Sequence, residues 1–247
     1  LKKVLLIDQG PPLSLTSDKS TECFRNWWAG PDNTMVSFMN RSIDLMEQHA
    51  RESNNRFLLN PHGYLFATAS EDMVEVFEKQ AKEAERFGAG KFRNIYNKSD
   101  YISNPNSGYI SELDGSDLLT GKSNVQEIFP YLNKDTVAVL HARRCGSLSA
   151  QQLGMYLLEE ARKCGCEFKT TYMKAIDTKS GAVDSIILEN NGVEEVIESN
   201  TLVICGGPHI NETLTSINIE LPIVVEKHIK ISLPDAFNIV PRSAPLV

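Results

Sequence analysis

Thr201-Leu-Val-Ile-Cys-Gly-Gly-Pro-His209 joins a short apolar segment to a sharp corner. Leu202 to Cys205 are too few for a helix and include two β-branched residues, which favours a strand buried on both faces. Gly206 and Gly207 permit positive φ and a close backbone approach to a ligand, and Pro208 suits the first turn of a helix. Ligands commonly bind at the carboxyl ends of strands in open α/β sheets. A simple strand-to-helix turn is the alternative interpretation.

The start of the chain predicts a second apolar strand, which ends in an acidic residue. Val4-Leu-Leu-Ile-Asp8 carries four apolar residues, and Gly10 follows the acid closely. In dinucleotide-binding sheets a carboxylate at the tip of the second strand accepts hydrogen bonds from the ribose hydroxyls. Asp8 stands in that place, with a solvated acid at a strand end as the alternative. We therefore expect Val4 to Asp8 and Leu202 to Cys205 to be neighbours in one mostly parallel sheet.

The composition is that of an ordinary globular protein. The chain has 247 residues, of which 41% are hydrophobic and 23% charged, enough for one large domain or two interleaved ones. A net charge of −7 and a pI of about 5.3 argue against a nucleic-acid partner, because such binding needs a basic surface. No apolar run reaches the roughly 20 residues that span a bilayer, and no signal sequence opens the chain. We expect a soluble, cytoplasmic protein without an integral membrane segment.

Cysteine and histidine spacings do not predict a metal site. The five cysteines are an odd number at irregular spacing, and Cys164 and Cys166 lie at a corner between a predicted helix and a predicted strand, as small core residues. The five histidines show no paired spacing of metal ligands. We predict no bound metal and no structural disulfide.

Loops, helices and strands alternate between the two apolar strands. A hydroxyl-rich loop with one arginine and two adjacent tryptophans comes first, and it suits either a wall for a polyanionic or aromatic ligand or a capped helix start with core indoles. Helical spacing of apolar residues predicts three helices, and alternation predicts strands, with Asn191-Gly192 as a tight turn. The segments are 13–28 for the loop, 35–52, 73–87 and 149–164 for the helices, and 63–67, 135–142, 167–176, 183–188 and 193–197 for the strands.

This order resembles the FAD-dependent oxidoreductases of the D-amino-acid oxidase type, which include glycine and sarcosine oxidases and D-amino-acid dehydrogenases. In that family an acid on the adenosine ribose and a Ser/Thr-rich loop around the flavin precede a helix opened by a glycine turn, here Gly146 to Ser149. The family's Ala-Ala-Gly-Ala-Trp corner is similar to Cys205-Gly-Gly-Pro-His209, and its Leu-Pro strand with a lysine is similar to Leu221-Pro-Ile-Val-Val-Glu-Lys227. The resemblance implies FAD as the cofactor, held by Asp8, Ser17, Ser20, Thr21, Met173, Cys205, Gly206 and Gly207.

The resemblance also implies an α/β fold with two interleaved domains. One is a Rossmann-like FAD-binding domain of the glutathione-reductase type with a mostly parallel sheet, expected to contain residues 1–33 and 134–215. The other is an α+β substrate domain, expected to contain residues 34–133 and 216–247. The family's Gly-x-Gly-x-x-Gly turn would precede Leu1, and its glycine-rich C-terminal segment would follow Val247. We therefore expect this chain to be a fragment in which both domains are incomplete.

The implied activity is oxidation of the carbon–nitrogen bond of an amino acid or a secondary amine. Hydride passes from the carbon next to the nitrogen to flavin N5, and the resulting imine hydrolyses in water. A cation that clamps the substrate carboxylate is expected, and Arg25, Arg242 and Lys227 are the candidates, with an ordinary surface charge as the alternative for each. The partners implied are a small-molecule amino acid or amine and an electron acceptor, which the sequence leaves open between oxygen, a quinone and a protein.

Two other functions are compatible with parts of this sequence. A truncated or non-catalytic homologue would not retain FAD, because losing three or four charge-assisted hydrogen bonds of about 1.5–3 kcal/mol each removes most of a micromolar affinity. A nicotinamide-dependent dehydrogenase fits less well, since such domains do not usually interrupt their sheet with an insertion as long as residues 35–132. Retention of flavin separates the first alternative from the enzyme.

Overall fold

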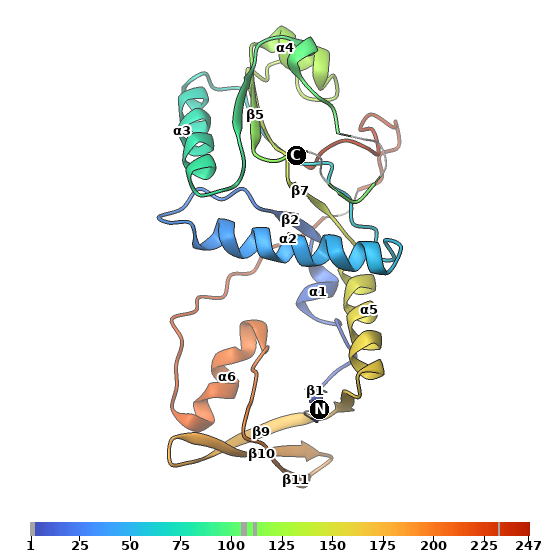
Figure 1. Cartoon of the computed structure of the whole chain (residues 1–247), viewed down its shortest axis with the longest axis vertical. Helices are drawn as coiled ribbons and strands as arrows, with labels where there is room; N and C mark the ends of the chain where they lie inside the picture. Colours follow the sequence, from blue (N-terminus) through green and yellow to red (C-terminus); the bar gives the residue numbers. More distant parts are fainter. Residues whose placement is uncertain (1–2, 105–107, 111–112, 232) are drawn as a thin grey trace. The chain divides into compact units, whose positions relative to one another are not determined.

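The computed structural model describes residues 3–104, 108–110, 113–231 and 233–247. The chain divides into two compact units, each built from two separate stretches of sequence (Figure 1). Unit 1 contains Leu1–Ser20 and Gly154–Ile231, and unit 2 contains Thr21–Leu153 and Ser232–Val247. These boundaries differ from the domain boundaries expected from the sequence, and the assignment of a cofactor and a substrate role to the two parts stays a prediction.

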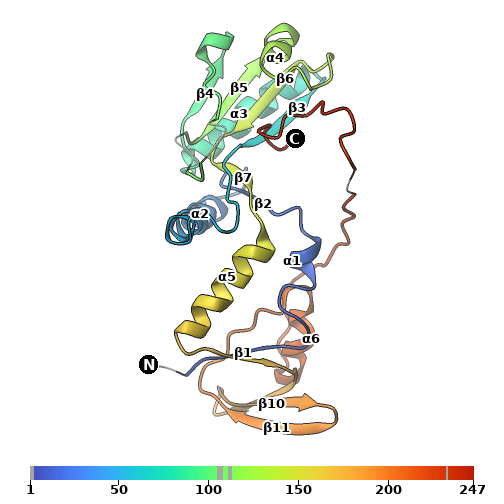
Figure 2. The same ribbon diagram turned by 90° about the vertical axis from the view of Figure 1, so that its right-hand side faces the viewer.

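Unit 2 is organised around a four-stranded sheet with a helix on each face (Figure 2). Leu140 and Ala142 of one central strand pack with Phe77 and Ala81 of a long helix, whereas Val139, which precedes Leu140, packs with Val125 of a short helix. Adjacent residues of a strand point to opposite faces, so the two helices cover opposite sides. The sheet order is β3 (Tyr64–Thr68), β6 (Ala138–Ala142), β5 (Ser116–Thr120) and β4 (Phe92–Ile95), and the helices are α3 (Asp72–Arg86) and α4 (Lys122–Ile128).

A long amphipathic helix and a short strand pair complete unit 2. Helix α2 (Thr34–Glu52) has 19 residues and buries Ile43 and Ala50 against Phe24, Phe57 and Leu59. The helix predicted over residues 35–52 is therefore confirmed. Strand β2 (Cys23–Arg25) pairs antiparallel with β7 (Cys145–Ser147), and the 3₁₀ turn η1 (Lys98–Asp100) lies between β4 and β5 in sequence.

Unit 1 contains a parallel strand pair and a three-stranded antiparallel sheet. Strand β1 (Leu5–Asp8) pairs with β8 (Glu167–Thr170), and β9 (Tyr172–Lys179), β10 (Ala182–Asn190) and β11 (Val193–Glu198) form the sheet. Asn191 and Gly192 take positive φ in the turn between β10 and β11, which confirms the predicted tight turn. The helices and 3₁₀ turns of unit 1 are α1 (Thr16–Lys19), most of α5 (Ala150–Lys163), η2 (Gly207–His209), α6 (Ile210–Leu214) and η3 (Thr215–Ile217).

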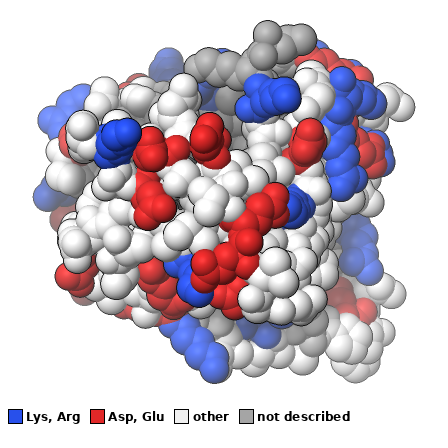
Figure 3. Space-filling model, turned by 90° about the horizontal axis from the view of Figure 1, so that it is seen from below, with Lys and Arg blue, Asp and Glu red and all other residues white. Residues whose placement is uncertain are grey.

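Acidic and basic side chains on strands β8 to β11 of unit 1 form ion pairs with one another. Lys174 of β9 pairs with Glu189 at 3.0 Å and with Glu194 at 2.5 Å, and Lys169 pairs with Glu195. The face shown in Figure 3 likewise carries acidic and basic groups side by side. These pairs offset part of the like-charge repulsion between neighbouring glutamates.

The expected α/β class is confirmed, but one expected strand pairing is wrong. Strand β1 lies beside β8, and Leu202 to Cys205 form no strand in the described part of the chain. Val203 is 78% exposed, so this segment is not buried on both faces. An apolar extended segment becomes a strand only where a neighbour pairs with its backbone groups, and sequence pattern alone does not identify that neighbour.

Parallel pairing is also more limited than expected. Among the described strands it joins β1 to β8 and β4 to β5, and the other paired strands are antiparallel. The mostly parallel sheet expected for the cofactor domain is therefore a two-stranded parallel pair in this structure.

Among the described residues, no helix has the length and apolar character needed to cross a bilayer.

Candidate functional site

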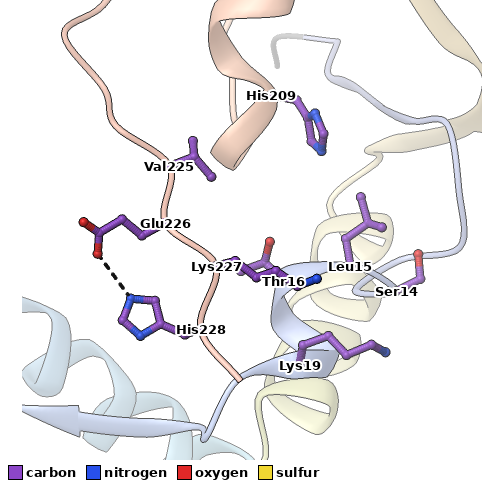
Figure 4. A pocket seen from close by; sticks show the side chains of 9 residues that line it. All are labelled: Ser14, Leu15, Thr16, Lys19, His209, Val225, Glu226, Lys227 and His228. Atoms are coloured by element: carbon purple, nitrogen blue, oxygen red, sulfur yellow. Dashed lines mark ion pairs between the residues drawn. The ribbon is translucent and has the colours of Figure 1, made fainter. Parts of the chain in front are cut away.

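Unit 1 contains an open pocket of about 480 Å³ formed by three segments that are far apart in sequence. The first segment is the loop that leads into α1 together with α1 itself, the second is the turn at His209, and the third is the extended segment from Val225 to His228. The lining residues are Ser14, Leu15, Thr16, Lys19, His209, Val225, Glu226, Lys227 and His228 (Figure 4). The hydroxyl-rich loop and the glycine corner are sequence features predicted to hold the cofactor, whereas Lys227 is a predicted candidate for binding the substrate carboxylate. None of the cofactor-binding residues predicted individually lines this pocket.

The pocket carries several basic side chains, most of which have acidic partners. Lys19 pairs with Asp18, and this contact holds the pKa of the Asp18 carboxyl below its usual value. His209 Nδ1 lies 2.9 Å from Glu212 Oε1, and His228 Nε2 lies 3.6 Å from Glu226 Oε2. Lys227 has no ion pair among the described residues.

The glycine corner has the sharp geometry that the sequence predicts. Gly207 takes a φ of +53°, and a Cβ built there would meet no atom within 4 Å. The backbone N–H of His209 donates to Gly206 O at 3.0 Å, which closes a 3₁₀ turn containing Pro208. Cys205, Gly206 and Gly207 are exposed, so this backbone is open to a ligand.

Asp8 is exposed at the carboxyl end of β1. Its Oδ1 accepts a hydrogen bond from the N–H of Gly10 at 3.0 Å, and no partner for Oδ2 is found in the described part of the chain. The carboxylate thus shapes the following turn and retains an acceptor for other groups. This position matches the expectation for a ribose contact without testing it.

The remaining predicted cofactor residues lie at several places. Ser17 is in α1, and Ser20 O accepts a hydrogen bond from Lys230 Nζ at 2.5 Å. Met173 is a half-buried residue of β9 opposite Leu188. Thr21 is the first residue of unit 2. The structure therefore brings the 14–19 loop, His209 and Lys227 into one pocket, and it leaves Met173 in the antiparallel sheet.

Arg25 of β2 is held between aromatic rings in unit 2. Its Cζ lies 4.1 Å from the centroid of the Trp28 ring, 5.6 Å from that of Tyr64 and 5.9 Å from that of Phe66. The Trp28 Nε1–H donates to Arg25 O at 3.1 Å, which fixes the indole against the guanidinium. Arg25 Nε is buried and has no hydrogen-bond partner among the described residues. A planar cation of this kind is suited to a carboxylate ligand.

The other two candidate cations differ from Arg25 in their surroundings. Arg242 is exposed near the C-terminus in unit 2. The pKa of the nearby Asp235 carboxyl is lowered mainly by hydrogen bonds from the N–H groups of Val240 and Ile239, and the Arg242 charge makes a smaller contribution. Lys227 is exposed in unit 1 and lines the pocket. Of the three, Arg25 alone combines aromatic stacking with a buried, unpartnered polar atom.

A buried ionic cluster in unit 2 was not predicted from the sequence. Asp117 of β5 is 2% exposed, and its carboxylate lies 3.1 Å from Arg143 Nη1 and 2.5 Å from Arg93 Nε. Arg143 is fully buried, and its Nη2 also donates to Ile102 O at 2.5 Å. Burial lowers the pKa of Arg143, and the Asp117 charge partly offsets this effect. The sequence offers only a weak signal for the cluster, namely that Asp117 stands directly before the apolar pair Leu118 and Leu119.

His141 joins this cluster as a neutral side chain. Arg143 Nη1 donates to His141 Nδ1 at 2.8 Å, and the Tyr101 hydroxyl lies 3.1 Å from the same nitrogen. Because a guanidinium only donates, Nδ1 must accept, and Nε2 carries the proton toward His62 O at 3.3 Å. Complete burial, followed by the Arg143 charge, holds the pKa of His141 well below 6.5.

The described residues contain no group of three histidine, cysteine or acidic side chains arranged to hold a metal ion. All five cysteines are free thiols. Cys145 is fully buried, and burial raises the pKa of its thiol to about 12. This thiol is therefore protonated and unreactive at neutral pH.

Comparison with solved structures shows the same fold in several oxidases and dehydrogenases. A glycine oxidase from Bacillus cereus matches with a TM-score of 0.64 and 17% identity over 87% of this chain and 53% of the other. An L-proline dehydrogenase from P. horikoshii matches with a TM-score of 0.68 and 16% identity over 91% of this chain and 57% of the other. An iminodiacetate oxidase from Chelativorans matches with a TM-score of 0.66 and 14% identity over 90% and 54%.

This chain thus spans little more than half the length of those proteins. No curated protein matches it significantly. A family model described as FAD dependent oxidoreductase matches residues 1–245. The chain therefore belongs to the DAO family of FAD-dependent oxidoreductases.

Proposed function

We propose that the protein oxidises the carbon–nitrogen bond of an amino acid or a secondary amine, with FAD held by unit 1 and the substrate carboxylate held by Arg25 of unit 2. The observation that carries the proposal is the pocket of unit 1, where the hydroxyl-rich loop, the residue after the glycine corner and Lys227 come together. Family membership supports FAD as the cofactor.

The residues of unit 1 fit a phosphate-bearing cofactor. Ser14 and Thr16 offer hydroxyls, and Lys19 and Lys227 offer ammonium groups to the pocket. The open backbone at Gly207 admits a ligand without a steric conflict. A volume of about 480 Å³ lies within the range of small-molecule sites, and it suits part of a dinucleotide. Asp8 would accept hydrogen bonds from ribose hydroxyls. When bound, FAD supplies the two-electron acceptor for amine oxidation.

Arg25 would position the substrate in unit 2. Trp28 stacks on the guanidinium and holds its orientation, so a carboxylate that binds it would be fixed in both position and angle. The ring centroids of Tyr64 and Phe66 lie 5.6 and 5.9 Å from Cζ of the same guanidinium, and apolar surface beside a charge pair would strengthen the contact by lowering the local dielectric constant. The substrates named for the matched structures, glycine, proline and iminodiacetate, all carry a carboxylate and an amine, and they are the first compounds to test.

The test is flavin retention followed by anaerobic reduction. The purified chain is mixed with FAD and desalted, and we expect the visible flavin absorption to remain with the protein and to bleach when a carboxylate-bearing amine is added. Arg25→Lys keeps the charge but loses the planar fork, so we expect flavin retention with reduction about a hundredfold slower. Arg86→Lys is the matched control, because Arg86 stacks on Phe87 outside either candidate site.

Flavin retention and the rate of flavin reduction test different parts of the proposal. A protein that releases all flavin on desalting supports the alternative of a non-catalytic homologue. A protein that keeps flavin but is reduced equally fast with Arg25→Lys retains the cofactor assignment and refutes the role of Arg25. Reoxidation of the reduced protein by oxygen, a quinone or a protein acceptor would then identify the electron acceptor.

A further inference from the structure

We infer that Lys227 binds the phosphate groups of the cofactor in the unit 1 pocket, rather than the carboxylate of the substrate. This inference rests on the proposed function. It begins from the charge of the pocket, where Lys19, His209 and His228 each have an acidic partner within reach. Lys227 lines the same pocket without an ion pair among the described residues. A cation that lacks a counter-charge beside a pocket is suited to an anionic ligand.

The segment that carries Lys227 is anchored on both sides of it. Before Lys227, the Asn211 side chain donates to Leu221 O at 3.0 Å and accepts from Leu221 N–H at 2.9 Å. After Lys227, Lys230 Nζ donates to Ser20 O at 2.5 Å. These contacts tie the extended chain to α6 on one side and to the loop after α1 on the other. Lys227 therefore lies between two contacts that are both made within unit 1.

The side chain of Lys227 extends toward the loop of Ser14 to Thr16 (Figure 4). An ammonium group and two hydroxyls that line one open pocket offer donors to a tetrahedral anion from different directions. Lysine acts as a point charge, and it binds phosphate oxygens without the planar matching that a carboxylate gains from arginine. The division of roles that follows is Lys227 for phosphate in unit 1 and Arg25 for carboxylate in unit 2.

The experiment compares the binding of FAD and riboflavin by quenching of flavin fluorescence, which needs no activity. Riboflavin shares the isoalloxazine ring but has no phosphate. The variants are Lys227→Gln, Lys227→Arg and the control Lys179→Gln, which removes the same charge from the exposed end of β9 in the same unit. We expect Lys227→Gln to bind FAD about tenfold more weakly, because it loses a charge-assisted hydrogen bond, and to bind riboflavin as the unaltered chain does.

Salt provides a second measurement. Raising the ionic strength should weaken FAD binding to the unaltered chain and to Lys227→Arg more than to Lys227→Gln, because a solvent-accessible ionic contact is screened. If Lys227→Gln and Lys179→Gln lower FAD affinity equally, Lys227 has no specific role and the inference is overturned while the cofactor assignment stands. Equal losses for FAD and riboflavin overturn it as well, since phosphate is then not the group recognised. If the unaltered chain binds no FAD, both the cofactor assignment and the role of Lys227 are refuted.

Discussion

At the scale of single residues, Asp117 and Arg143 form a buried ion pair. Asp117 is 2% exposed and Arg143 is fully buried, so each charge has lost its hydration. Their 3.1 Å contact and the second guanidinium of Arg93 offset that loss. Removing one member leaves the other charge buried and uncompensated, which costs far more than breaking a surface pair.

We expect Asp117→Asn to lower the free energy of unfolding by about 3–5 kcal/mol, because Arg143 then lacks a buried counter-charge. Asp135→Asn is the matched control, since Asp135 lies 3.5 Å from Lys122 at the exposed surface, and it should change stability by less than about 1 kcal/mol. Urea denaturation followed by circular dichroism measures both values. Similar small changes for the two variants would contradict the assignment of a buried, stabilising pair.

His141 makes stability depend on pH in a defined direction. Its pKa in the folded protein lies well below the ordinary 6.5, so the unfolded chain binds the proton more readily. The stabilisation is present above about pH 6.5 and is lost as the pH falls below that value, by up to about 1.4 kcal/mol per pH unit until the folded-state pKa is reached. The pKa of half-buried His62 is also lowered by burial and acts in the same direction.

We expect His141→Gln to reduce this pH dependence. Glutamine can accept from Arg143 and donate to His62 O, but it does not titrate. Unfolding free energies measured between about pH 7.5 and about pH 5.5 should fall less steeply for the variant than for the unaltered chain, whatever their difference at neutral pH. Parallel curves for the two proteins would show that His141 does not resist protonation.

At the scale of elements, the contact between β7 and the segment at Asn60 depends on one close backbone approach. A Cβ at Gly146 would lie 1.8 Å from Asn60 O, which belongs to the chain that bridges to Ser147. The backbone N–H groups of Asn60 and Ser147 donate to each other's carbonyl oxygens at 2.9 and 3.1 Å. Glycine is required here because of this contact, and not because of an unusual φ.

We expect Gly146→Ala to destabilise the protein by about 1–3 kcal/mol or more, because the backbone around Asn60 must move to admit the methyl group. Gly30→Ala is the control, since its nearest neighbouring atom is 3.9 Å from the added Cβ and its φ is not in the left-handed region. Thermal unfolding of the two variants provides the comparison. An equal effect of both substitutions would show that the contact with Asn60 can relax freely.

Regular helices and regular strands were both predicted at this scale. The predicted strands form at Tyr64–Thr68, Ala138–Ala142, Ala182–Asn190 and Val193–Glu198. Residues 35–52 and 73–87 repeat apolar side chains at helical spacing, and α2 and α3 form there. Strand β5 was missed, because Ser116 and Asp117 are polar and their burial depends on the sheet and on two distant arginines. Residues 202–205 have a strong strand pattern, yet they find no partner among the described residues.

At the scale of the whole molecule, the two units have their own cores. Three clusters of buried apolar residues lie in unit 2, and β9, β10 and α6 supply Ile176, Ile186, Leu188 and Leu214 to the interior of unit 1. Because each unit is built from two stretches of sequence, the chain passes between them more than once. Separate cores favour separate local unfolding reactions.

We expect Asp117→Asn to accelerate hydrogen exchange in β3, β5 and β6 of unit 2 by about a hundredfold or more, with little change in β9, β10 and β11 of unit 1. The reason is that the substitution lowers the free energy of unfolding of unit 2, which contains Asp117, and leaves that of unit 1 unchanged. Hydrogen exchange with mass spectrometry at neutral pH measures both regions in one sample, so unit 1 serves as the internal control. Uniform acceleration across both units would show that they unfold as a single cooperative body.

The amino-acid sequence by itself determined the local features of this protein: the amphipathic helices, the Asn191-Gly192 turn, the corner at Gly207 and the order of motifs that identifies the family. These depend on neighbouring residues, through helical periodicity and the φ values open to glycine. Only the tertiary structure decided that β1 pairs with β8, that Asp117 meets Arg143 and that Lys227 lies in a pocket with Thr16. Each of these contacts joins residues far apart in the chain. The free energy of burial and backbone pairing selects such partners, and a short stretch of sequence does not predict them.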